Sequence, residues 1–162
     1  MTMEVPVLLD RETERRLAAE LFNQTWRLLE MESRTPDQDD EMLHCAHASR
    51  YHWGRVGQPV HLARGEWQVS RVYSVLERGA PAAFHASRCL AIAQTHRLDP
   101  FDVAVAYEAL ARAALVRGDR AEAERFAEEA RRAGAGISDE EDLQILTGDL
   151  ATLPFNRPPH TE

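Results

Sequence analysis

The sequence contains no lysine, so that all 19 of its basic residues are arginine. Aromatic residues make up only 7% of the chain, and isoleucine occurs only at positions 92, 137 and 145, whereas alanine is abundant. This composition favours closely packed helices over sheets. The chain also lacks both a run of about 20 apolar residues and the pattern of a signal peptide. These absences predict a cytoplasmic protein that does not bind or span a membrane.

Motifs for catalysis and for metal binding are missing as well. The sequence has no G-x-S-x-G nucleophile elbow, no glycine-rich phosphate loop and no HExxH helix. Cys45 and Cys89 stand apart, without CxxC spacing, and each lies inside a helical pattern, so buried free thiols are expected in place of a disulfide or a zinc site. We therefore predict no catalytic residue, no metal, no cofactor and no enzymatic activity.

Helix-capping signals recur along the chain at regular intervals. The expected caps, each with an acceptor for free backbone N–H groups, are Thr35-Pro36 with Gln38, Asp99-Pro100 with Asp102, Asp119 with Glu122, and Ser138 with Glu141. Gly57, Gly79 and Gly118 follow helical patterns and are expected to take the left-handed conformation there. The resulting helices are predicted near residues 10–32, 36–55, 59–78, 81–97, 100–117, 119–134 and 138–151.

Seven helices joined by short turns predict an all-α domain of antiparallel helical hairpins over residues 1–153, with the last helix as a cap. The third and fifth helices are apolar nearly all round, which predicts that they are covered on two sides. The sixth helix is amphipathic and is expected in an outer layer. Residues 154–162 contain Pro158-Pro159, cannot continue a helix, and are predicted to form an extended or mobile tail.

Large and small residues alternate at fixed spacing between residues 104 and 137. The positions are Tyr107, Leu110-Ala111, the turn at Gly118-Asp119, Ala123 and Ala130. This pattern resembles a tetratricopeptide repeat (TPR). The strings at 47–54 and 63–67 are similar to those of a group of short bacterial TPR-like proteins to which no activity is assigned. The resemblance implies a right-handed solenoid of hairpins that binds peptides or proteins in a groove and is seldom catalytic.

Charge is distributed unevenly along the chain. Residues 1–43 carry a net charge of −6, residues 44–118 of +4, and residues 119–162 of −6, within a total of −8. An acidic chain is a poor candidate for binding nucleic acid, because neutralisation of phosphate by basic side chains supplies most of that affinity. Any acidic partner is expected to meet the basic middle of the chain.

The middle of the chain also holds the densest group of polar and aromatic residues. The residues predicted to line a ligand- or peptide-binding groove are His47, Arg50, Tyr51, Trp67, Arg71, Tyr107 and Glu108. Arginine forks suit carboxylates or phosphates, and aromatic side chains serve as anchors. The alternative is a satisfied structural network, in which the i,i+4 pairs Trp67–Arg71 and Glu108–Arg112 are local helix contacts.

Three functions follow as hypotheses. The favoured one is a non-enzymatic scaffold of TPR type that binds an acidic peptide, a partner helix or a small anion. The alternative is a metal- or histidine-dependent enzyme centred on His44 and His47, which share a helix face and to which His61, Glu66 or His85 would add a further ligand. The third is a homodimer, since the end helices of repeat stacks leave apolar faces unless they are capped.

Overall fold

The computed structural model describes residues 9–155, and it shows seven α-helices and no strand among them, which confirms the all-α prediction. The helices are α1 (Arg11–Leu29), α2 (Pro36–Val56), α3 (Pro59–Val75), α4 (Gly79–Thr95), α5 (Pro100–Val116), α6 (Arg120–Gly134) and α7 (Glu140–Ala151). Every boundary lies within three residues of its predicted position. Most of the predicted tail, residues 156–162, lies outside the described residues.

Side-chain caps begin several of these helices, as the sequence predicted. Thr35 and Gln38 form a reciprocal capping box at the start of α2, in which the Gln38 backbone N–H donates to the Thr35 hydroxyl and the Thr35 N–H donates to the Gln38 side chain. The Asp119 carboxylate accepts from the Glu122 N–H at 2.9 Å. Replacing such a cap by alanine costs about 1 kcal/mol.

Two caps differ from the prediction. The N-cap of α7 is Asp139, not Ser138, because the Asp139 carboxylate accepts from the Asp142 N–H at 3.0 Å. Asp99 makes no side-chain capping bond at the start of α5, where Pro100 occupies the first turn. Proline is well suited to that place, since it has no N–H group to leave unsatisfied.

The predicted glycine terminators are correct only at Gly118, whose φ is +81°. Gly57 is extended, and Gly79 is the first residue of α4. The left-handed residues after α3 and α4 are instead Glu77 and Arg97, with φ of 58° and 50°. There the closing hydrogen bonds of the helix end offset the steric cost of a side chain at positive φ.

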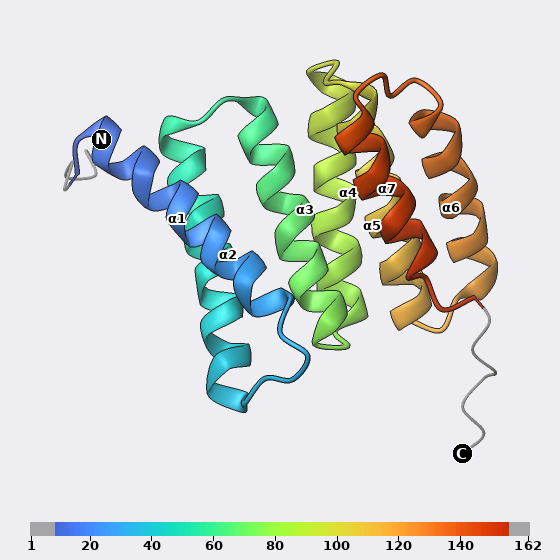
Figure 1. The fold of residues 1–162 in the computed structure, drawn as a ribbon, viewed down its shortest axis with the longest axis horizontal. Coiled ribbons are helices and arrows are strands. Elements are labelled where there is room, and N and C mark those ends of the chain that lie inside the picture. The colour runs from blue at the N-terminus through green and yellow to red at the C-terminus, as the bar shows by residue number, and fades with distance from the viewer. Residues whose placement is uncertain (1–8, 156–162) are drawn as a thin grey trace, which may run out of the picture.

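The helices form two layers (Figure 1). Each helix packs against the next in the chain, α3 also packs against α1 and α5, and α5 also packs against α7. Within the described residues, the backbones of α2, α4 and α6 do not approach one another closely. One layer therefore holds α1, α3, α5 and α7, the other holds α2, α4 and α6, and Figure 1 shows α1 near one end of the long axis and α6 near the other.

The core lies around α3 and α5, which are buried on several sides as predicted. Its large side chains are Trp67, Phe101, Val105, Leu110 and Leu146, packed with many buried alanines. Because the alanine side chain is small, the helices of the two layers approach one another closely. Side chains of α3 therefore contact the hairpin before it, α1–α2, and the helix after its own hairpin, α5.

Candidate functional site

Buried carboxylates connect the helices to one another. Glu14, Glu66, Asp102 and Glu108 are each at most 4% exposed. Each is paired with an arginine from another helix: Glu14 with Arg55, Glu66 with Arg50, Asp102 with Arg64, and Glu108 with Arg71. A buried charge is tolerated only when it is paired and hydrogen-bonded, so these contacts specify how neighbouring helices align.

Glu66 on α3 holds the largest number of partners. Its Oε1 accepts from Arg50 Nε on α2 at 2.9 Å and from Arg88 Nε on α4 at 3.0 Å. Its Oε2 lies 2.6 Å from Nδ1 of His85 on α4. We call these four residues the Glu66 cluster. Two guanidinium groups face one carboxylate, so the cluster carries a net positive charge even when His85 is neutral.

The cluster keeps Glu66 ionised. Burial raises the pKa of the Glu66 carboxyl, but the hydrogen bonds from His85 and Arg88, together with the charge of Arg50, outweigh burial and hold this pKa below its ordinary value. The carboxylate is therefore charged at neutral pH and orients both guanidinium groups.

An aromatic and imidazole stack covers the cluster. Tyr73 and His85 are stacked, with ring centroids 5.6 Å apart, and His47 on α2 lies 5.5 Å from the His85 ring. The His47 Nε2 is 2.8 Å from the Tyr73 hydroxyl. Burial and the neighbouring His85 lower the pKa of His47. Side chains of α2 and α4 thus meet over α3, although the two helix backbones do not touch.

Large aromatic side chains are exposed on the two helices that carry His47 and His85. Tyr51 on α2 and Phe84 on α4 are each 58% exposed, and the Arg88 guanidinium lies 5.7 Å from the centroid of the Phe84 ring. We call His47, Tyr51, Phe84 and Arg88 the α2–α4 surface. Exposed aromatics next to arginine are typical of surfaces that bind other molecules.

A second network joins α3, α5 and α7, and its charges balance. Arg71 lies 3.4 Å from Glu108 and 2.8 Å from Asp149, and Arg112 Nε donates to Glu108 at 2.9 Å. Arg112 also donates to the backbone oxygen of Asp149 at 3.0 Å and to the Thr152 hydroxyl at 2.7 Å. Two carboxylates match two guanidinium groups, so this network fastens α7 to the core and leaves no charge free.

The seven residues predicted to line one groove lie in separate parts of the structure. His47 and Arg50 lie at the Glu66 cluster, and Tyr51 is exposed beside it. Arg71 and Glu108 belong to the second network.

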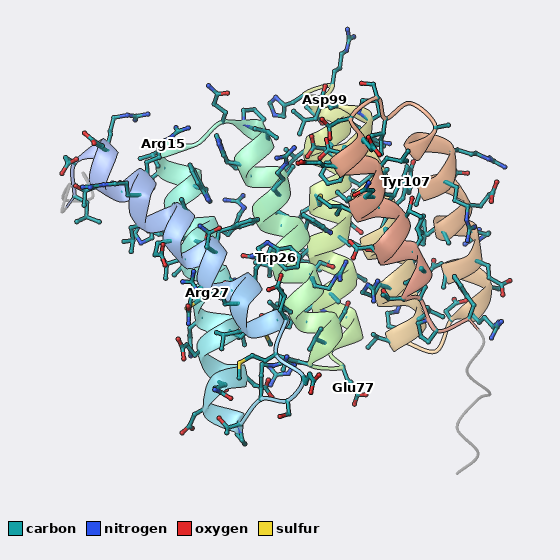
Figure 2. The ribbon with its side chains drawn as sticks, in the orientation of Figure 1. Arg15, Trp26, Arg27, Glu77, Asp99 and Tyr107 are labelled. Carbon is teal, nitrogen blue, oxygen red and sulfur yellow. The ribbon has the colours of Figure 1, made fainter. Side chains whose placement is uncertain are left out.

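The other two predicted residues pack against aromatic neighbours. Trp67 is a core residue, 6% exposed, against Trp26 and Phe101, and Figure 2 shows Trp26 where α1 meets α3. Tyr107 packs against Phe126. The seven residues therefore lie on three helices, α2, α3 and α5, in different surroundings.

Sequence reasoning missed three residues that complete the candidate site, Tyr73, Phe84 and Arg88, and it named Glu66 and His85 only as possible metal ligands. One signal was present, since His85 and Arg88 are spaced i,i+3 and share a face of α4. Their partner Glu66 lies 19 and 22 residues away along the chain. No local spacing predicts that pairing.

The remaining polar residues do not gather into a ligand set. Within residues 9–155, no group of three His, Cys, Asp or Glu side chains is placed to hold a metal ion. Cys45 is half-buried and Cys89 is buried, both are free, and burial raises the pKa of both thiols.

No helix in the described part is long and apolar enough to cross a membrane. No protein-family model matches the chain. No curated protein matches it either.

Proposed function

We propose that this protein is a non-enzymatic scaffold of TPR type that binds an acidic segment of another protein at the α2–α4 surface. The observation that carries the proposal is the unequal charge of the Glu66 cluster, where one carboxylate faces two arginines and the exposed Phe84 ring lies next to Arg88. By comparison, the network around Glu108 is balanced.

The arrangement of the helices supports the scaffold part of the proposal. Consecutive hairpins place α1, α3, α5 and α7 in one layer and α2, α4 and α6 in the other, as expected of stacked helical repeats. The segment that resembles a TPR, residues 104–137, spans most of α5 and all of α6. A right-handed stack and a cytoplasmic location are part of the same proposal.

The chemistry of Arg88 supports an acidic partner. Arg88 uses Nε for Glu66, and its side chain is 49% exposed, so its terminal nitrogens remain available to a carboxylate from outside. Glu66 holds the guanidinium in place, which reduces the entropy lost on binding. Tyr51 and Phe84 would contact apolar residues that flank the acidic ones.

Selection from a random peptide library displayed on phage would test the proposal. Peptides that combine acidic with apolar residues should be enriched on the immobilised protein. Their binding should weaken roughly tenfold or more when Arg88→Ser and Phe84→Ser are combined, because a charge-assisted pair and an aromatic anchor are both removed.

The matched control is Arg125→Ser on α6, an arginine whose side chain is 76% exposed, far along the chain from the surface. It should leave peptide binding unchanged. Enrichment of peptides without acidic residues, or equal loss of binding in the Arg125→Ser control, would show that the proposed surface is not the binding site.

A further inference from the structure

A pocket of about 180 Å³ opens between α1, α2 and α3. It is lined by Ala19, Phe22 and Asn23 of α1, Trp53 of α2, and His61 and Arg64 of α3. Arg64 precedes Glu66 by two residues, which places the two on nearly opposite faces of α3. The pocket is therefore separate from the α2–α4 surface.

One wall of the pocket is built from two stacked rings. The Trp53 and His61 rings are stacked, with centroids 4.2 Å apart and planes within 7° of parallel. His61 Nδ1 accepts the Gln58 backbone N–H at 3.0 Å, which fixes the orientation of the ring. Burial, then the charges of Arg15 and Arg64, lower the pKa of His61. His61 is therefore neutral with its proton on Nε2, where it is a hydrogen-bond donor.

Two arginines, Arg64 and Arg15, lie at the rim of the pocket. Arg64 Nε donates a hydrogen bond to Asp102 Oδ1 at 2.9 Å. The terminal nitrogens of Arg64 have no hydrogen-bond partner among residues 9–155. The Arg15 guanidinium lies 5.4 Å from the Trp53 ring centroid and makes no ion pair within the same residues. Figure 2 shows Arg15 on the N-terminal half of α1. No carboxylate is among the lining residues, and since Asp102 balances the charge of Arg64, the excess positive charge near the pocket comes from Arg15.

We infer that this pocket binds a small aromatic monocarboxylate. An enclosed apolar cavity of about 150 Å³ holds one benzene molecule. The present pocket of about 180 Å³ is open to solvent and has room for a single ring, with part of the ligand left exposed. The ring would pack against Phe22 and the Trp53–His61 stack. The carboxylate would accept from the terminal nitrogens of Arg64, with the Asn23 amide as a further donor. This site is independent of the proposed peptide-binding surface.

The test titrates benzoate, benzamide and acetate separately into the full chain. Binding of each probe is monitored through the NMR signals of the Trp53 indole and the Asn23 amide. Benzoate supplies both ring and charge, benzamide only the ring, and acetate only the charge. Benzoate should give saturable shifts at both residues and bind roughly tenfold tighter than either of the other probes. Absence of saturable shifts, or equal affinity for benzoate and benzamide, would overturn the inference.

Two variants localise the effect. Ala19→Leu fills the pocket and should abolish benzoate binding while the helical circular dichroism stays unchanged. Arg64→Gln combined with Asp102→Asn removes the pocket cation without leaving a buried charge unpaired, and should weaken benzoate roughly tenfold but leave benzamide unaffected. Arg125→Gln on α6 is the matched control and should bind as the natural chain does. Unchanged benzoate binding in Ala19→Leu would place the ligand elsewhere and refute the site.

Discussion

Replacement of Glu66 by glutamine tests whether the Glu66 cluster holds the first two hairpins together. The substitution keeps the shape of the side chain but removes its charge. Arg50, Arg88 and His85, which come from α2 and α4, would then face a neutral amide.

The magnitude follows from the exposure of the partners. Removing one partner of a fully buried ion pair costs about 3–5 kcal/mol. Arg88 is 49% exposed and contributes little, whereas Arg50 is only 18% exposed. Since the glutamine oxygen still accepts one hydrogen bond, we expect a loss of about 2 kcal/mol in the free energy of unfolding. For a chain of this size that lowers Tm by about 4–8 °C.

The pH dependence of the effect gives a second check. The folded pKa of Glu66 lies below its ordinary value of 4.5, so its stabilisation is fully present above that pH and is lost as pH falls through the folded pKa. The difference in stability between the natural chain and Glu66→Gln should thus be largest near pH 7 and shrink below pH 4.5.

Urea unfolding monitored by circular dichroism measures the free energy of unfolding, and repeating it at several pH values gives the pH dependence. The control is Glu124→Gln on α6, since Glu124 pairs with Arg120 in solvent and should contribute less than about 0.5 kcal/mol. A Glu66→Gln variant within about 0.5 kcal/mol of the natural chain at pH 7, or a difference that does not depend on pH, would refute the reasoning.

Three other changes have definite expected outcomes. Arg112→Ala should loosen α7, because the bonds from its guanidinium to that helix end are lost, and hydrogen exchange should accelerate in α7 but not in α1. Gly148→Ala should raise the free energy of unfolding measured in urea by about 0.5–1 kcal/mol, since an added Cβ meets no atom outside its own helix backbone within 4 Å; a decrease contradicts this. A maleimide should modify Cys45 before Cys89, which is 1% exposed, and equal rates would count against the described burial.

Helix positions were predictable because their signals are local. A capping side chain such as Thr35 acts on N–H groups only a few residues away, and apolar spacing is read within one helix. Gly79 shows where this reasoning stops. An added Cβ there would lie 2.5 Å from Arg117 Cγ, so the glycine permits a close approach to the end of α5 instead of ending a helix.

The candidate site was predictable only in part. The density of polar and aromatic residues led to the prediction of His47, Arg50 and Tyr51 as groove residues, and His47 and Arg50 lie at the Glu66 cluster. The predicted i,i+4 pair of Glu108 with Arg112 is confirmed. Arg71 was grouped with Trp67 on spacing, but its guanidinium contacts residues of α5 and α7. Contacts of that kind join positions tens of residues apart.

The sequence by itself determined seven helices, their limits and the basic character of the middle of the chain, because caps, periodicity and charge depend on neighbours along the backbone. Only the tertiary structure decided that Glu66 pairs with arginines from two other helices, and that Arg71 and Glu108 belong to the separate network with α7. The physical reason is that helix packing selects which face of α3 meets which neighbour, and this choice depends on interactions summed over the whole core.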